Sequence, residues 1–278
     1  MKSIVAYRAL LTAFLLTGAP LVVSAQQPAA PRSAPPVAAD SRKDWDIRIG
    51  AGALYQPEFE GSSKYTVTPL PLLSVNYRDL VFLQGPMLGV NAFTWRDATG
   101  GSKFQVGPLV RYQLGRDEDD SDDLRGMGDI DGSVEIGGFM NYAVGAWSAG
   151  LSVFRDVGDS HDGLTAKVSA GHRLALTPRI SLRSEIFTTW ADDNYVQTFF
   201  GVTGAQSARS GLREYRPEGG FKDAGLTLDL DYKLTENWSL VGRAGYKRLL
   251  GDAADSPLVK DRGDANQFST GLMIGYRF

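Results

Sequence analysis

One short stretch of the sequence holds residue types that could carry general acid–base chemistry. Asp159, Ser160, His161 and Asp162 place an imidazole beside a hydroxyl and two carboxylates, which are groups that general base catalysis uses. These residues are neighbours in the chain, and a run of neighbours does not by itself supply a catalytic geometry. Because Asp, Ser and the following Gly163 are typical turn residues, we interpret the stretch as a turn. We predict no catalytic residue and no enzyme activity.

An acidic run could supply a second kind of chemistry, the binding of cations. Arg116–Asp131 (RDEDDSDDLRGMGDID) contains eight carboxylates and two arginines. Carboxylate oxygens suit Ca²⁺, or a divalent cation that bridges to lipopolysaccharide, but the spacing does not match the Asp-x-Asp-x-Asp-Gly calcium loop. Like charges at this density favour a solvated loop that repels itself. We therefore predict an extracellular loop there, with no metal site and no cofactor.

Two polar segments are candidates for contacts with a ligand or a partner. Ala191–Gly220 mixes aromatic residues with arginines and is longer than a closing loop requires. We expect it to constrict an internal channel, with a surface binding loop as the alternative. Gly251–Pro257 is either a defined loop for a ligand or partner, or a loop kept for stability, and both readings stay open. The candidate contact residues are Arg209, Arg213, Arg216, Asp252 and Asp255.

The elements that must position these residues are strands. From Trp45 onward, successive segments place apolar side chains on every second position, which is the pattern of a strand with two different faces. Ala224–Tyr232 is the cleanest internal case, and Gln267–Phe278 carries the pattern to the carboxyl terminus with only Met273 out of place. Strands with lipid on one side and a polar lumen on the other have this pattern. We expect the barrel assembly machinery to recognise the last strand through Leu272, Ile274, Tyr276 and Phe278.

The N-terminus is typical of a secretory signal peptide over residues 1–25. Lys2 and Arg8 give a positive region, Ala9–Gly18 is a short apolar region, and we expect cleavage between Ala25 and Gln26. The apolar run is too short for a transmembrane helix. Residues 26–44, rich in proline and alanine, are expected to form an extended periplasmic tail. Residues 45–278 are expected to form the outer-membrane barrel.

Composition agrees with this destination and restricts the partners. The chain has no cysteine, so no disulfide stabilises it. It has 32 Gly, 13 Phe, 11 Tyr and 5 Trp, yet its mean hydropathy is an ordinary −0.18. That combination fits a barrel whose lumen and loops dilute its lipid-facing half. The formal net charge of −3 gives no polybasic character, so we expect no nucleic-acid partner.

Turn lengths predict the topology. Bacterial barrels keep short turns on the periplasmic side and long loops outside. This parity holds along the chain only if Leu80–Trp95 is split at Gly85-Pro86 into two strands, Leu80–Gln84 and Met87–Trp95. The result is an all-β protein, an antiparallel transmembrane β-barrel of about twelve strands with both termini periplasmic. Because proline cannot donate to a strand ladder, we expect bulges or kinks at Pro69, Pro71 and Pro108.

Aromatic residues fall beside the predicted periplasmic turns and termini. Amphipathic rings at headgroup level form such a girdle in membrane barrels. The residues concerned are Trp45, Tyr77, Tyr142, Trp147, Tyr232, Trp238, Tyr276 and Phe278.

Several segments between the strands resemble the MltA-interacting protein family, also called MipA/OmpV, of Gram-negative outer membranes. They occur in family order over nearly the whole mature chain, and Arg248–Val259 (RLLGDAADSPLV) is the most specific of them. The others are Tyr55–Gly61 with Pro69–Leu72, Gly115-Arg116, Gly126–Asp129, Phe200–Val202, and Ser210–Leu212 with Tyr215. The resemblance implies an outer-membrane barrel associated with a membrane-bound lytic murein transglycosylase. It implies no catalytic constellation.

Two functional hypotheses follow. The first is a scaffold for murein-remodelling enzymes, a transglycosylase or a synthase, which would use the periplasmic turns or the tail. The second is a narrow pore or a ligand or adhesion receptor, which would use the lumen and the long loops. Outer-membrane lipid and lipopolysaccharide are expected partners of either.

Overall fold

The structure, a computed structural model, describes residues 44–278. The predicted signal peptide, its cleavage point between Ala25 and Gln26, and the predicted tail up to residue 43 lie outside the described residues. Between residues 44 and 278, no helix has both the length and the apolar composition that crossing a membrane as a helix requires.

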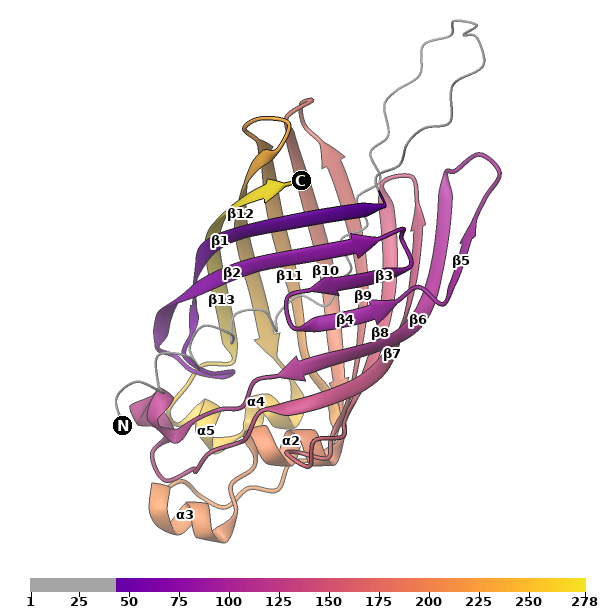
Figure 1. Ribbon diagram of the computed structural model, residues 1–278. Helices are drawn as coiled ribbons and strands as arrows, with labels where there is room; N and C mark the ends of the chain where they lie inside the picture. Colours follow the sequence, from indigo (N-terminus) through magenta and orange to yellow (C-terminus); the bar gives the residue numbers. More distant parts are fainter. Residues whose placement is uncertain (1–43) are drawn as a thin grey trace, which may run out of the picture.

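Thirteen antiparallel strands form one closed sheet (Figure 1). Each strand pairs with its sequence neighbours, except that β4 bypasses β5 to pair with β6, and β13 pairs with β1. The strands are β1 (Trp45–Pro57), β2 (Tyr65–Tyr77), β3 (Val81–Gln84), β4 (Met87–Val90), β5 (Phe93–Arg96), β6 (Ser102–Gln113), β7 (Ser133–Val144), β8 (Trp147–Asp156), β9 (Leu164–Ala175), β10 (Ile180–Ala191), β11 (Gly220–Lys233), β12 (Trp238–Leu249) and β13 (Asn266–Arg277).

The predicted split at Gly85-Pro86 is confirmed, because β3 and β4 form a hairpin around it. The predicted strand Met87–Trp95 is broken once more, at Asn91-Ala92, into β4 and β5. Both pieces pair with β6, so they share one position in the ring. The wall therefore has twelve strand positions, as the turn parity predicted, and one extra strand that it did not predict.

The prolines correct one expectation. β2 pairs with β1, and β6 pairs with β7, without any shift of register, so no bulge lies at Pro69, Pro71 or Pro108. The irregularity is in the neighbouring strands instead. β3 pairs with β2 only at Ser74–Tyr77, and the break between β4 and β5 lies beside Pro108.

One end of the barrel carries short turns and both ends of the described chain (Figure 1). The Arg78 N–H donates to the Asp44 carbonyl, and the Phe278 N–H donates to the Ile47 carbonyl. The predicted aromatic girdle lies at this end, which we call the short-turn end. The Trp45 ring packs against Tyr77 in a tilted arrangement with ring centroids 4.5 Å apart, and Trp238 contacts Tyr276 at 5.1 Å.

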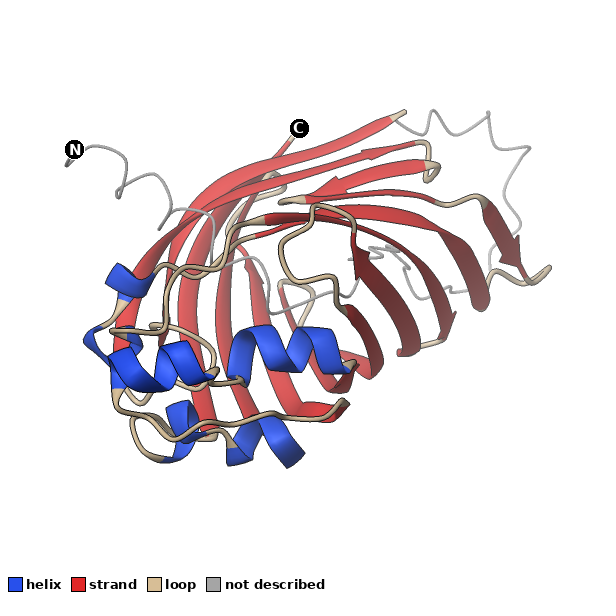
Figure 2. Cartoon of the chain, turned by 90° about the horizontal axis from the view of Figure 1, so that it is seen from below, coloured by secondary structure: helices blue, strands red, loops and turns tan. Residues whose placement is uncertain are grey.

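The other end carries a folded cap built from segments that we predicted to be loops (Figure 2). Four short helices lie there, together with the 3₁₀ turns η2 (Glu118–Asp120) and η3 (Asp122–Leu124). The helices are too short for a 3.6-residue period to emerge from the sequence, which is why we missed them. They are α2 (Asp193–Phe200), α3 (Gly204–Ser210), α4 (Gly251–Asp255) and α5 (Pro257–Lys260).

The two faces of the wall differ as predicted. Outward side chains are apolar and exposed, for example Ile186 at 60%, Phe268 at 57% and Leu272 at 57%, as expected of a surface against lipid. Inward side chains are mixed. Ion pairs line β9–β12, whereas along β3–β8 a cluster of Phe82, Leu109, Phe139 and Phe154 lies among polar residues such as Arg111 and Glu135.

Candidate functional site

A cavity of about 240 Å³ lies inside the barrel directly beneath the cap. Its wall comes from β1, β6 and β8–β13, and α2 closes it with Tyr195 and Phe199. Six cationic side chains line it against four carboxylates. Three of these cations have carboxylate partners just outside the lining, since Arg111 pairs with Glu135, Lys167 with Glu185 and Arg243 with Asp229, so the cavity has no excess of positive charge. The cationic residues are Arg111, Arg116, Lys167, Lys222, Arg243 and Lys247, and the acidic residues are Glu58, Glu60, Asp120 and Asp223.

Glu60 is the centre of a charge network in this cavity. Its carboxylate accepts hydrogen bonds from the ammonium groups of Lys222 at 2.7 Å and Lys247 at 2.5 Å, and Lys222 also donates to Asp223 at 2.7 Å. Burial alone would raise the pKa of Glu60, but the two lysines outweigh it and lower the pKa to about 2. The network joins the β1–β2 loop to β11 and β12 across the barrel mouth.

A β-bulge turns Lys222 into the lumen. The register between β10 and β11 shifts where Thr189 pairs with Asp223 and Trp190 pairs with Phe221. The extra residue lets Lys222 and Asp223, which are neighbours in sequence, both lie buried while Phe221 stays exposed. Strict alternation would have placed Lys222 on the lipid face, so the sequence pattern concealed this residue.

Helix α2 forms the roof of the cavity. Its N-cap is Asp192, whose side chain accepts from the Tyr195 N–H at 3.0 Å. The buried Tyr195 ring packs against Phe199 with centroids 4.6 Å apart and lies 5.6 Å from the Lys222 ammonium group. Burial raises the pKa of Tyr195 to about 12, so its hydroxyl is neutral. Our expectation that Ala191–Gly220 constricts the channel agrees with this position.

The cap is held by two hydrophobic clusters of its own. One packs α2 residues Val196 and Phe200 against Leu249 and Val259. The other packs Phe59 and residues of four separate segments around it, namely Leu124, Met127, Val202, Leu212 and Leu258. Fully buried apolar side chains of this kind stabilise a fixed arrangement. The cap is therefore a packed layer rather than a set of independent loops.

The acidic run is part of that layer, which corrects our prediction of a self-repelling, solvated loop. Leu124 and Met127 are buried in the cap, and Arg116 and Ile130 bond to each other through their backbones at 2.8 Å. The Arg116 guanidinium donates to the Phe199 carbonyl at 2.8 Å, and burial lowers its pKa to about 10. Burial of the apolar side chains of Leu124 and Met127 outweighs the repulsion between the carboxylates of the run. Among residues 44–278, no cluster of metal-ligand side chains is present.

His161 lies in a turn organised by Asp156. The Asp156 carboxylate accepts from the backbone N–H groups of Gly158, Ser160, His161 and Asp162 at 2.6–2.9 Å. The His161 ring is buried, its Nδ1 accepts from the Gly163 N–H at 3.0 Å, and its Nε2 lies 3.5 Å from Glu135. Within residues 44–278, Asp159 and Ser160 form no hydrogen bond to the ring, and the Ser160 hydroxyl donates to the Asp131 carbonyl instead. The stretch is a turn, as we interpreted it.

The five candidate contact residues lie in the cap and not along the cavity. Arg209 is exposed on α3 and donates to the Gly126 carbonyl at 3.3 Å, Arg213 lies 5.6 Å from the Tyr215 ring, and Arg216 is exposed. Asp252 accepts from the Glu218 N–H at 2.7 Å, and Asp255 pairs with Lys260 at 2.8 Å. The contacts of Arg209, Asp252 and Asp255 join segments of the cap. A ligand role for them stays a prediction.

Comparison with known proteins decides the family. A model of the family described as "MltA-interacting protein MipA" matches residues 49–278. The chain belongs to this family.

Curated relatives of the chain support this family assignment. The chain is 27% identical over 242 residues to the "MltA-interacting protein" of Escherichia coli K12, covering 84% of this chain and 90% of that protein. It is 26% identical over 238 residues to the "Putative outer membrane protein YiaT" of the same organism, covering 84% and 91%. It is 25% identical over 175 residues to "Outer membrane protein OmpV" of Vibrio cholerae, covering 63% and 64%. The protein is an outer-membrane β-barrel.

Solved barrels are more distant. The NanC porin superposes with a TM-score of 0.42 at 9% identity, covering 84% of this chain and 100% of that one. OmpT of Vibrio cholerae gives a TM-score of 0.39 at 9% identity, covering 84% and 97%.

The segments that carry the family resemblance build the cap and its cavity. Tyr55–Gly61 contains Glu60 and Phe59, and Arg248–Val259 forms α4 and most of the α4–α5 corner. Val202 and Tyr215 form an isolated backbone bridge within the cap. The sequence resemblance therefore identified segments that form the cap, but it did not show that these segments contact one another.

Proposed function

We propose that this protein binds a small anionic solute in its lumen, beneath a cap that closes one mouth of the barrel. The observation that supports the proposal is the Arg116 guanidinium, which lines the cavity, is buried, and has no hydrogen-bond partner at Nε and Nη2 among residues 44–278. A buried guanidinium with donors to spare attracts an anion in a site of low dielectric. The cap then faces the cell exterior and the short-turn end, with both termini, faces the periplasm, because bacterial barrels keep short turns on that side.

The protein acts as a receptor rather than as a wide pore or an enzyme. Two hydrophobic clusters keep the cap packed over the cavity, so an open water-filled channel requires the cap to move. We assign no catalytic role to His161, because its Nδ1 accepts a backbone hydrogen bond and the ring is buried. A wild-type barrel in a planar bilayer should show no steady conductance. A steady large conductance would contradict the closed cap.

Anion binding is tested with inorganic phosphate and Lys247→Gln. Lys247 is suited to this test because Glu60 keeps Lys222 as a partner when Lys247 is lost. Calorimetric titration of the folded barrel should show phosphate binding that weakens about tenfold in the variant, as expected for one charge-assisted hydrogen bond. The matched control is Lys260→Gln, whose lysine pairs with Asp255 on the exposed face of the cap. Equal affinities in all three proteins, or no binding at all, would overturn the proposal.

A second function, docking of a murein-remodelling enzyme, is favoured by the family description "MltA-interacting protein". Murein lies on the periplasmic side, so the partner must use the short-turn end or the tail. Deleting residues 26–43 and measuring retention of a membrane-bound lytic transglycosylase tests the tail. Loss of retention would place the contact in the tail, and full retention would move it to the turns. A full-length barrel that retains no transglycosylase would exclude this function.

A further inference from the structure

The barrel wall is incomplete between β2 and β6. Along residues 44–278, the edge of β2 from Tyr65 to Leu72 has no backbone partner on the side of β3, because β3 reaches only Ser74–Tyr77 (Figure 1). The interruption begins at the β3–β4 turn. The Gly85 N–H donates to the Leu73 carbonyl at 2.9 Å, and the Tyr112 N–H donates to the Pro86 carbonyl at 3.1 Å. We call the gap beyond this turn the wall notch.

Two prolines make the notch a lasting feature of the wall. The Leu73 carbonyl points to the side of β3, so the alternating residues Pro71 and Pro69 face the notch as well. Unpaired N–H groups are expensive in hydrocarbon, and proline has none. At Pro69 and Pro71, this edge therefore leaves no backbone donor unpaired. The lack of donors at these two positions weakens pairing with any further strand there.

The notch opens at the depth of the lipid chains. Val67 and Leu73, on the outer face of the same edge, are exposed at 62% and 42%, which fits the apolar band of a membrane barrel. Tyr55 and Tyr65 stack with ring centroids 5.1 Å apart at the cap end of that band, where an aromatic girdle is expected. The unpaired edge beyond Tyr65 therefore borders hydrocarbon and not water.

The inner side of the notch is apolar. Leu70 forms a buried cluster with Leu54 and Met273, and Leu72 packs against it. A barrel lumen is usually polar, so this apolar patch just inside the gap in the wall is unusual. Leu54 also lines the cavity beneath the cap. The patch therefore connects the notch to the lysines.

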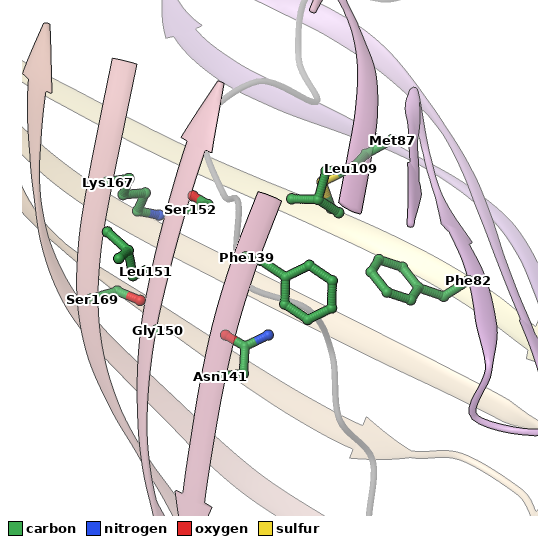
Figure 3. A pocket seen from close by; sticks show the side chains of 10 residues that line it. All are labelled: Phe82, Met87, Leu109, Phe139, Asn141, Gly150, Leu151, Ser152, Lys167 and Ser169. Carbon is green, nitrogen blue, oxygen red and sulfur yellow. The ribbon is translucent and has the colours of Figure 1, made fainter. Parts of the chain in front are cut away.

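The other apolar part of the lumen offers no such path. Phe82 and Phe139 meet edge to face with centroids 5.6 Å apart (Figure 3). The space around them and Leu109 is about 10 Å³, no more than a single water requires. A ligand chain that enters through the notch must therefore lie over Leu70 and Leu72.

We propose that the wall notch admits an anionic single-chain amphiphile from the outer leaflet. Its alkyl chain lies over Leu70, Leu72 and Leu54, and its phosphate or carboxylate head reaches the lysines of the cavity. The cavity of about 240 Å³ is smaller than the roughly 300–1,000 Å³ of sites that enclose a whole drug-sized ligand, so it holds a head group and leaves the chain outside. This inference rests on the anion binding proposed above and adds the ligand class and its route.

The first test compares probes on the barrel in nanodiscs. Dodecyl phosphate should bind at least about tenfold more tightly than inorganic phosphate, because burial of several methylenes is added to the head-group contacts. Dodecanoate should compete with it, and dodecyltrimethylammonium should not. Leu70→Gln should remove the advantage of the chain while phosphate affinity is unchanged, and Leu70→Met should keep it. Equal affinity for dodecyl phosphate and phosphate would overturn the lateral entry.

The second test does not depend on anion binding. The chain has no cysteine, so a bimane label at Leu72→Cys reports one place. Lipids brominated at mid-chain should quench this label more strongly than a label at Thr189→Cys, which lines the cavity on the opposite wall. Equal quenching at both sites would overturn the notch even if phosphate binds. Strong quenching at Leu72 without phosphate binding would instead overturn the anion-binding function and the anionic head group.

Discussion

The two sides of the barrel wall are built on different principles. Along β9–β12 every ladder is complete, and the inner face carries ion pairs such as Lys167–Glu185 at 2.9 Å and Arg243–Asp229 at 2.6 Å. Between β2 and β6 the ladders are short, and the inner face carries an apolar cluster with Phe82 and Leu109 beside the Lys103–Asp79 pair. A complete ladder pairs the backbone N–H and C=O groups. The side chains on it are then not needed to close the wall and can bind a ligand. An incomplete ladder leaves the wall dependent on side-chain packing.

The largest effect should come from filling the break on the incomplete side. Gly107 of β6 lies under the β4–β5 break, where an added Cβ would be 1.7 Å from the Val90 carbonyl oxygen. Gly107→Ala should destabilise the barrel by about 3 kcal/mol, since backbone must move to admit the methyl group. The control on the complete side is Gly242→Ala in β12, whose Cβ would meet nothing within 4 Å. Urea unfolding followed by heat-modifiable gel migration measures both, and equal midpoints would contradict the contrast.

A smaller effect should come from the complete side, where charges tie the wall to the cap. Glu60→Gln removes the negative charge that Lys222 and Lys247 share. It should lower the free energy of unfolding by about 2 kcal/mol at neutral pH. Because the pKa of Glu60 falls from 4.5 unfolded to about 2 folded, its contribution is complete above about pH 4.5 and is lost as the pH falls towards 2. Wild type and variant should therefore converge in stability over that range. Glu236→Gln, in an exposed turn, is the control, and a pH-independent difference would argue against the network.

Adding backbone N–H donors at the notch should lower the stability of the barrel modestly. Pro69→Val and Pro71→Val together place two unpaired N–H groups in hydrocarbon, which should cost about 1 kcal/mol each. Leu73→Val on the same face adds no unpaired group and should change stability by less than about 0.5 kcal/mol. Unfolding midpoints in lipid vesicles would compare them. A stabilised double-valine variant would mean that the edge has a partner.

The smallest effect is expected at the surface of the cap. Asp122 pairs with Arg125 at 2.8 Å, but both side chains are nearly 80% exposed. Asp122→Asn should therefore change stability by less than about 0.5 kcal/mol. A thermal unfolding scan checks this, and a change as large as that of Glu60→Gln would show that the acidic run is more tightly coupled to the cap than its exposure indicates.

Much of the wall could be predicted because strand signals are local. The predicted last strand, Gln267–Phe278, lies within one position of the observed β13, and the Gly85-Pro86 split was predicted where it is observed, since alternation and turn residues lie within a few positions of one another. The cap could not be predicted in this way. Its clusters join Phe59 to Leu258 and Leu124 to Leu212, and no short window of sequence contains such pairs.

The sequence by itself determined which face of each strand meets lipid, how many strands close the ring and which family the chain resembles. Only the tertiary structure decided that Glu60 meets Lys222 and Lys247, 162 and 187 residues away, and that Pro69 and Pro71 border a gap. The side-chain period of a strand depends on its own backbone. A partner across the lumen, or a neighbour that stops short, depends on the length and register of other strands.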